Sequence, residues 1–196
     1  MGDGIDFWNR FYEDGTRPVW DMDRATPLVE EVLGLAGPLG LRPGAEIVVP
    51  GCGYGHDAVD LAARGFQVTG LDFAPLAIQG AQARYGDAVA WSQGDWFTTR
   101  LGPWDAIFDH TCFVAMEPPR RADYLAACVR HLKPGGLWLV ALFHDTQGRP
   151  APPHEIAMAD LRRLVEPVLE ILHLDHATAS HPRRAGREYL LVARRR

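Results

Sequence analysis

A glycine-rich turn is the first group of residues in this chain whose types and spacing suggest chemistry. The glycines are Gly51, Gly53 and Gly55 in the stretch VPGCGYGHD, with Cys52 between the first two. A turn without side chains lets the backbone approach a ligand closely. The dinucleotide fingerprint G-x-G-x-x-G needs a glycine where this chain has His56. The spacing therefore suits a small zwitterion better than a diphosphate.

Two acidic positions follow the turn at the ends of later apolar runs. Asp72 lies 21 residues after Gly51, where a carboxylate can accept hydrogen bonds from both ribose hydroxyls of an adenosine. The stretch GDW then offers Asp95 to an adenine amino group, with Trp96 beside it. Turn, Asp72 and GDW in this order indicate S-adenosyl-L-methionine as the cofactor and S-adenosyl-L-homocysteine as its product.

Three other interpretations stay open at this point. The glycines could make only a tight turn, and Asp72 could only cap the next helix. A nicotinamide-dependent oxidoreductase uses the same type of fold, although His56 counts against it. A non-catalytic module that binds S-adenosylmethionine is the third, and cofactor titration and a methyl-transfer assay would separate these readings.

Strands and helices that alternate along the chain must position these residues. Near-continuous apolar strands that alternate with helices predict a mostly parallel sheet covered on both faces. The predicted strands are 45–50, 66–72, 88–95, 104–109, 137–143, 169–177 and 188–195, and the predicted helices are 56–65, 75–86, 121–132 and 155–165. A further helix is expected within 25–37, with Thr26 as its N-cap and Pro27 in its first turn.

The predicted fold class is α/β: a three-layer, doubly wound, Rossmann-like methyltransferase fold with a seven-stranded sheet. The last two strands have no helix between them, so an antiparallel strand is expected at that edge of the sheet. The whole chain, 1–196, is expected to form one domain, with an N-terminal helical lid segment (1–40) before an α/β core (45–196). Ligands of such folds bind outside the carboxyl ends of the strands.

The composition of the chain argues against nucleic-acid-binding, membrane-spanning and secreted classes of protein. The chain has 196 residues, a formal net charge of −5 and 47% hydrophobic residues, which is typical of a globular protein without a nucleic-acid surface. No apolar run is long enough for a transmembrane helix, and the start resembles no signal peptide. The three cysteines are far apart, which fits free thiols in a reducing compartment. A cytoplasmic monomer without membrane or nucleic-acid partners is expected.

With these motifs in hand, the chain resembles the thiopurine S-methyltransferase superfamily, closest to its halide/thiol/thiocyanate methyltransferase branch. The resemblance covers nearly the whole chain and rests on the lead-in FWNRFYEDGTRPVWD, the turn VPGCGYGHD, the segment FDHTCFVAMEPPRRADYLAACVRHLKPGG and the stretch RAGRE. Tyr12 stands where the lead-in often has a second tryptophan, Arg17 precedes Pro18, and His110 replaces a tyrosine or arginine. The position of His110 faces the acceptor in that family.

The resemblance implies methyl transfer to a small soft nucleophile: a thiol, sulfide, thiocyanate or halide. A thiopurine or tellurium acceptor on the same fold is the alternative. Displacement from a sulfonium needs alignment and exclusion of water, and a soft anion needs no general base. The predicted catalytic residues are Asp109 and His110, and no metal is expected. The predicted cofactor contacts are Trp8, Tyr12, Trp20, Gly51, Cys52, Gly53, Asp72, Phe73, Asp95, Trp96 and Asp109.

Two of these predictions concern residues with a plausible structural role. Trp8, Tyr12 and Trp20 could form a lid over the sulfonium, because aromatic faces attract cations. Phe7, Trp8, Phe11 and Tyr12 also have helical spacing, so one face could simply be core. His110 could orient the acceptor or take a thiol proton, since the unperturbed pKa of histidine is near 6.5.

Overall fold

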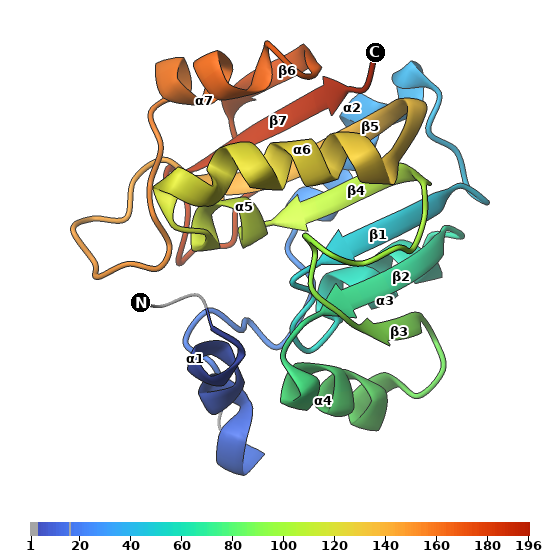
Figure 1. The fold of residues 1–196 in the computed structure, drawn as a ribbon, viewed down its shortest axis with the longest axis vertical. Helices are drawn as coiled ribbons and strands as arrows, with labels where there is room; N and C mark the ends of the chain where they lie inside the picture. The colour runs from blue at the N-terminus through green and yellow to red at the C-terminus, as the bar shows by residue number, and fades with distance from the viewer. Residues whose placement is uncertain (1–3, 16) are drawn as a thin grey trace.

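The computed structural model describes residues 4–15 and 17–196, and its centre is a seven-stranded sheet with helices on both faces (Figure 1). The strand order is β3-β2-β1-β4-β5-β7-β6. The strands are β1 (Glu46–Pro50), β2 (Gln67–Asp72), β3 (Ala90–Gln93), β4 (Trp104–His110), β5 (Leu132–Phe143), β6 (Glu170–His176) and β7 (Glu188–Arg194). This order reverses beside β1, which is the place where doubly wound folds bind ligands.

Strands β1 to β5 pair in parallel, whereas β7 pairs antiparallel with both β5 and β6. The predicted fold class is confirmed. β6 is the outermost strand and β7 lies one place inside it. Because no helix separates β6 from β7, the chain turns back along its neighbour, which reverses the strand direction.

The helices form the two outer layers. They are α1 (Ile5–Asn9), α2 (Leu28–Ala36), α3 (His56–Ala63), α4 (Pro75–Tyr85), α5 (Cys112–Ala115), α6 (Arg121–His131) and α7 (Met158–Val165), with short 3-10 turns at Arg10–Gly15, Gly37–Leu39 and Pro118–Arg120. Helices α5 to α7 cover one face around Trp138 and Tyr124, whereas α2 and α3 cover the other around Ile47 and Phe108. α4 lies at the β3 end of the sheet, next to α1 (Figure 1).

Two predicted elements differ from the structure. The sequence KPGG was expected to be a break before a strand at 137–143, but β5 already begins at Leu132. The four residues form a bulge, because the pairing with β4 shifts register between Trp104 and Ala106. The last helix begins at Met158 instead of 155, because the backbone is still extended at its N-cap Ala157, and Glu155 before it accepts a hydrogen bond from the Thr146 hydroxyl.

The predicted lid segment divides into two parts. Its second part, α2, is a layer of the core, because Leu28, Val29 and Val32 are fully buried against the sheet. The N-cap of α2 is Pro27 instead of the predicted Thr26, and Thr26 lies one residue before it, with its hydroxyl accepting the Leu28 N–H at 3.4 Å. The first part contains α1 and the loop up to Pro27, and lies over the carboxyl ends of the strands. Residues 1–3 and 16 of the predicted lid lie outside the described residues.

Candidate functional site

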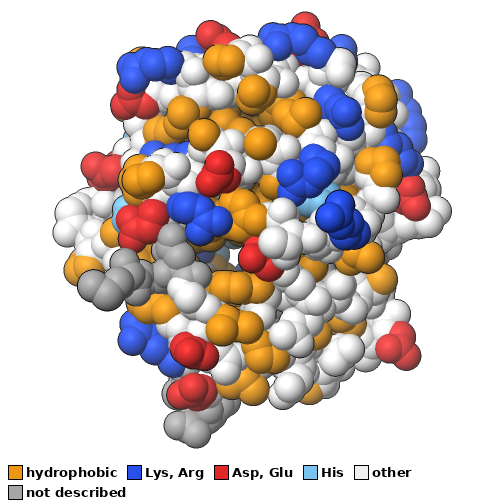
Figure 2. All heavy atoms as spheres, in the orientation of Figure 1, with side chains coloured by type: hydrophobic (Ala, Val, Ile, Leu, Met, Phe, Trp, Pro, Cys, Tyr) orange, Lys and Arg blue, Asp and Glu red, His pale blue; other side chains and the backbone are white. Residues whose placement is uncertain are grey.

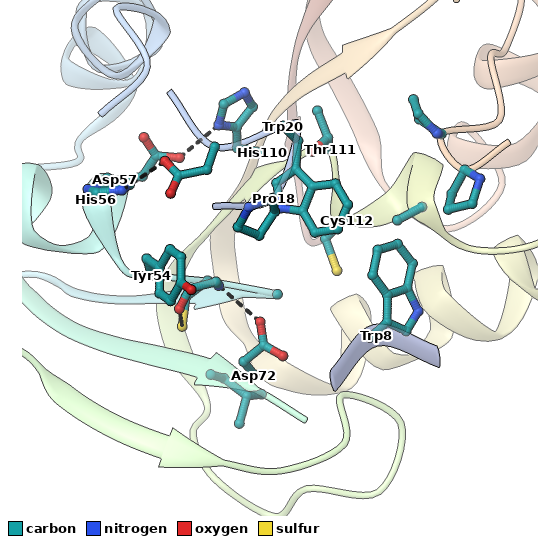
Figure 3. Close-up of a pocket in the computed structure, with 18 of the residues that line it drawn as sticks. Trp8, Pro18, Trp20, Tyr54, His56, Asp57, Asp72, His110, Thr111 and Cys112 are labelled. Atoms are coloured by element: carbon teal, nitrogen blue, oxygen red, sulfur yellow. Dashed lines mark hydrogen bonds and ion pairs between the residues drawn. The ribbon is translucent and has the colours of Figure 1, made fainter. Parts of the chain in front are cut away.

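A cavity of about 270 Å³ opens at the carboxyl ends of the central strands, near the lower end of the size range of small-molecule sites. Figure 2 shows hydrophobic side chains around the hollow in this face of the molecule. Six parts of the chain build its wall: the glycine turn after β1, the ends of β2 to β4, the N-terminal segment, the stretch from α5 into α6, the end of β5 with the loop after it, and the loop before β7. Figure 3 shows Trp8, Trp20, Cys112 and Asp72 around this same space.

Asp72 is fixed at the end of β2 by the turn beside it. Its Oδ2 accepts the Gly53 N–H at 2.9 Å and its Oδ1 accepts the Ala74 N–H at 2.9 Å (Figure 3). Burial raises the pKa of Asp72, and these backbone donors partly oppose the shift. The Phe73 N–H is a third backbone donor to this carboxylate. A carboxylate has about four lone-pair positions, so Asp72 can still receive a ribose hydroxyl group.

Two glycines of the turn are required by what packs over them. A side chain on Gly55, which has φ +83°, would meet the ring of Trp91 at 2.3 Å. A side chain on Gly53, with φ +55°, would meet the Tyr12 hydroxyl at 3.2 Å. Gly53 thus brings the turn against the aromatic N-terminal segment, while Gly55 brings α3 against the sheet. Gly51 and Cys52 also line the cavity, as predicted cofactor contacts should.

The predicted adenine side lies after β2 and β3. Phe73, Asp95 and Trp96 all line the cavity. The Asp95 carboxylate accepts the Phe97 N–H at 2.8 Å through Oδ1, which fixes the loop. Trp96 is buried against the His131 ring, 4.5 Å between centroids. These three residues therefore lie where the sequence placed them, at the edge next to Asp72.

The aromatic residues of the N-terminal segment pack together over the cavity. The Trp20 ring lies 5.7 Å from Trp8, 4.8 Å from Phe11 and 6.4 Å from Tyr12, all at steep angles. Tyr12 in turn meets Tyr54 of the glycine turn at 5.1 Å. Trp8, Tyr12 and Trp20 line the cavity, whereas Phe11 packs behind them. Trp8, Tyr12 and Trp20 therefore lie where a lid would need them, and they also pack with Phe11 in one aromatic cluster; their role as a lid stays a prediction.

A buried charged cluster forms the end of the cavity next to β4. His110 Nδ1 lies 2.7 Å from Asp57 Oδ2, and His110 Nε2 lies 2.6 Å from Arg184 Nη1 (Figure 3 shows the first contact). Arg184 Nη1 also contacts Glu188 Oε1 at 3.3 Å, and Arg184 Nη2 donates to the Trp20 carbonyl at 2.9 Å. The cluster thus joins α3, β4, β7 and the N-terminal segment.

The surroundings of His110 argue against a role as general base at neutral pH. Burial alone would lower the pKa of His110, but the Asp57 carboxylate, helped by Glu188, raises it to about 9. The same pairing lowers the pKa of Asp57 despite its burial. The short contact with Arg184 Nη1 favours an unprotonated Nε2, but the carboxylates of Asp57 and Glu188 outweigh it and keep His110 as the imidazolium at neutral pH. In both states Nδ1 faces Asp57 and Nε2 faces Arg184, so neither nitrogen is free to take a thiol proton.

Asp109 lies behind the cavity wall, which corrects the expectation that it stands beside the reacting group and the cofactor. The side chain is fully buried, and it accepts the Tyr124 hydroxyl at 2.7 Å and the Phe113 N–H at 3.2 Å. Burial raises its pKa to about 6, opposed by these donors. Tyr124 and Cys112 line the cavity, so Asp109 acts on the site through the Tyr124 hydroxyl and the Cys112 backbone N–H that it accepts from.

The remaining wall at this end is largely apolar. Thr111 has φ 67°, which is unusual for a β-branched residue and turns the chain sharply from β4 into α5. That turn brings Cys112 and Met116 into the wall, and Phe143 and Pro153 face them from the end of β5 and the following loop. Burial, followed by the charge of Asp109, raises the pKa of the Cys112 thiol well above its usual value. Cys112 therefore stays a neutral, soft surface.

The sequence analysis missed several residues of the site. Asp57, Arg184 and Glu188 build the charged cluster, and Asp21 and Arg24 line the cavity from the N-terminal segment. Four of these residues lie in stretches that the sequence analysis quoted: Asp57 ends VPGCGYGHD, Asp21 ends FWNRFYEDGTRPVWD, and Arg184 and Glu188 belong to RAGRE. None of the stretches indicated that these side chains reach the cavity. No group of three or more His, Cys, Asp or Glu side chains within the described residues is arranged to hold a metal ion. No helix of the described residues is long and apolar enough to cross a membrane.

Comparisons with known proteins agree with this geometry. The sequence model of the family described as thiopurine S-methyltransferase (TPMT) matches residues 4–193. Thiocyanate methyltransferase 1 of Brassica oleracea is 32% identical over 191 residues, which cover 93% of this chain and 82% of the relative. Probable thiol methyltransferase 2 of Arabidopsis thaliana is 28% identical, with 82% of this chain and 72% of the relative covered.

A solved structure supports the same fold. The 1,6-didemethyltoxoflavin-N1-methyltransferase of Burkholderia thailandensis, solved with bound 1,6-didemethyltoxoflavin and S-adenosylhomocysteine, has a TM-score of 0.74. It is 21% identical, and the match covers 97% of this chain and 86% of that one. The oxidoreductase alternative finds no support in these relatives.

Proposed function

This chain belongs to the thiopurine S-methyltransferase family, and from that premise we propose that it methylates a small soft anion, in the first place a thiolate. It is a methyltransferase that depends on S-adenosylmethionine. Thiocyanate and halide are the next acceptors in the proposal, and a thiopurine or a tellurium compound is the alternative. The observation that carries the proposal is that the charged Arg184–His110 cluster and the apolar wall around Phe143 lie at the same end of the cavity.

The residues present fit the cofactor. Gly51, Gly53, Asp72, Asp95 and Trp96 all line the cavity. We assign the two glycines to backbone contact with the cofactor, Asp72 to the ribose, and Asp95 and Trp96 to the adenine. Trp8 carries a buried indole N–H without a partner in the described part of the chain, on the wall of the same cavity. The aromatic faces of Trp8, Tyr12 and Trp20 are suited to a sulfonium. When bound, S-adenosylmethionine supplies a methyl group that is already activated for displacement.

The chain's own residues select and align the acceptor. Two carboxylates and the Arg184 guanidinium, together with a protonated His110, make a cluster of balanced charge. A buried anion without compensation is costly. A large, weakly hydrated anion loses less on entering this space than a hard one, and the walls of Cys112, Met116 and Phe143 complement its polarisable surface. No proton has to be removed in the site if the acceptor arrives as an anion.

We infer that residues 4–15 and 17–27 act as the lid in this reaction. The segment supplies Trp8, Tyr12 and Trp20 to the cavity, and the Arg184 guanidinium holds the carbonyl of Trp20. A lid that excludes water keeps the nucleophile reactive and its approach to the methyl group in line. We further propose a monomer that works in the cytoplasm without nucleic acid. Its charge of −5 and its three free cysteines support this.

The test is a panel of acceptors with the purified chain and S-adenosylmethionine. The arms are methanethiol, sulfide, thiocyanate, iodide, tellurite and a thiopurine, with an arm without acceptor as control. Release of S-adenosylhomocysteine and the methylated product are both measured. The proposal expects the highest kcat/KM for a thiol or sulfide. Methylation of the thiopurine or tellurite alone would favour the alternative, and no methylated product from any arm would contradict the proposal.

A further inference from the structure

The Asp21 carboxylate is a buried charge whose second oxygen is unused. The side chain is only 4% exposed and lines the cavity from the N-terminal segment. Its Oδ1 accepts the Asp23 N–H at 2.6 Å and lies 3.0 Å from His56 Nε2. Its Oδ2 is buried and has no hydrogen-bond partner within residues 4–15 and 17–196. A buried acceptor without a donor is costly, so this oxygen marks the place of a missing donor.

The order of the strands in the sheet indicates which part of the cofactor lies next to Asp21. The ends of β3, β2, β1 and β4 lie side by side in this order. Asp95 and Trp96 follow β3, Asp72 ends β2, and the turn after β1 leads into His56. An adenosine that lies across Asp95 and Asp72 directs the rest of the molecule toward β1. Asp21 lies there, beside His56, so the group that meets it belongs to the amino-acid end.

Arg24 lies three residues further along the same segment and completes the charge pattern. It lines the cavity, and no ion pair of the described chain involves its guanidinium. The neighbouring Arg17, by comparison, pairs with Asp23 at 3.5 Å on the surface. A carboxylate with a free oxygen and a guanidinium without a counter-ion on one cavity wall complement a zwitterion, which carries one charge of each sign.

We propose that the N-terminal segment holds the amino-acid end of S-adenosylmethionine, with Asp21 receiving the α-ammonium group and Arg24 the α-carboxylate. The proposal rests on the proposed function and assigns a subsite to it. The ammonium group donates to Asp21 Oδ2 and supplies the donor that this oxygen lacks. Since both residues belong to the segment that carries Trp8, Tyr12 and Trp20, the cofactor's own charges fasten the lid over its sulfonium.

The consequence is a selectivity between cofactor analogues. S-Adenosylhomocysteine carries both charges, its deaminated analogue lacks the ammonium group, and 5′-methylthioadenosine lacks the whole amino-acid end. In the parent chain, loss of the ammonium should weaken binding by about 10- to 100-fold, the range of a hydrogen bond between charged groups. 5′-Methylthioadenosine uses only the Asp72 and Asp95 side of the cavity, so it reports whether that side is intact.

The experiment measures the affinities of the three ligands by calorimetry for the parent, Asp21→Asn and Arg24→Gln. Asp23→Asn is the matched control, because that carboxylate belongs to the same loop but its side chain is 63% exposed. Asp21→Asn should weaken S-adenosylhomocysteine by about 10- to 100-fold and leave the deaminated analogue and 5′-methylthioadenosine within about twofold. Arg24→Gln should weaken both ligands that carry a carboxylate, and Asp23→Asn should change none.

Other results overturn the subsite. If Asp21→Asn weakens S-adenosylhomocysteine and its deaminated analogue equally, Asp21 acts only on the shape of the loop. If it changes neither, the ammonium group lies elsewhere. A parent chain that binds 5′-methylthioadenosine and S-adenosylhomocysteine equally well has no amino-acid subsite at all. A parent chain that binds none of the three would contradict the proposed function itself.

Discussion

The two halves of the cavity are built in different ways. The half around the glycine turn and Asp72 is made of consecutive strand ends, with contacts between residues close to each other on neighbouring strands, such as Gly53 N–H to Asp72. The half around His110 is held by buried charges from distant parts of the chain, such as Asp57 and Arg184. The first half can recognise a constant cofactor through backbone geometry. The second can change its acceptor by exchanging a few charged or apolar side chains.

The largest effect is expected from a substitution in the charged half of the cavity, and it concerns the stability of the fold. Glu188→Gln leaves the Arg184 guanidinium buried without its carboxylate, and losing one partner of a buried pair costs about 3 kcal/mol or more. We expect the free energy of unfolding, measured in urea, to fall by this amount. Glu170→Gln is the control, since its contact with Arg194 is on the surface and long, 4.0 Å. An equal effect of both substitutions would mean that the cluster does not stabilise the fold.

The next effect concerns the cofactor half. Asp72→Ala should weaken S-adenosylmethionine binding by about 1.5 to 3 kcal/mol, the range for hydrogen bonds to a charged group. Calorimetry measures this affinity directly. Asp60→Ala is the control, because Asp60 lies on α3 and its carboxylate pairs with Arg64 at 2.8 Å, away from the cavity. An affinity within twofold of the parent would remove Asp72 from the ribose site.

A smaller effect tests the lid that connects the halves. Trp20→Ala should lower kcat by about tenfold, since one aromatic contact with a cation is worth about 0.5 to 2 kcal/mol. The dissociation constant of S-adenosylmethionine should change less than kcat, because the lid acts chiefly when the methyl group is aimed and shielded. Val19→Ala, at a side chain that is 79% exposed, is the control. Equal losses in both quantities would make Trp20 a simple cofactor contact.

The same contrast explains what the sequence could predict. The strand ends, the glycine turn, Asp72, Asp95 and Trp96 follow local patterns, so their places on the cavity wall could be predicted from spacing. The Asp57–His110 pair joins residues 53 positions apart and the Arg184–His110 pair 74 positions apart. No local pattern encodes such pairs. Asp109 was misplaced for a related reason: the end of a strand shows where a residue is, but not whether its side chain faces the cavity or Tyr124.

The central claim is that the acceptor enters the site as an anion, and paired pH profiles of kcat/KM for iodide and a small thiol test it most directly. Iodide carries no proton and the pKa of His110 is raised to about 9, so the iodide profile should be flat from about pH 6 to 8. It should fall only as the pH passes through that value and the cluster loses a positive charge.

The thiol profile should rise about tenfold for each pH unit over the same range, because the thiolate fraction grows until the pH reaches the pKa of the thiol. His110→Gln should leave this slope unchanged, even where it lowers the rate itself. A thiol profile that levels off near pH 6.5 in the parent, and loses this break in His110→Gln, would contradict the account by making His110 the base that removes the proton.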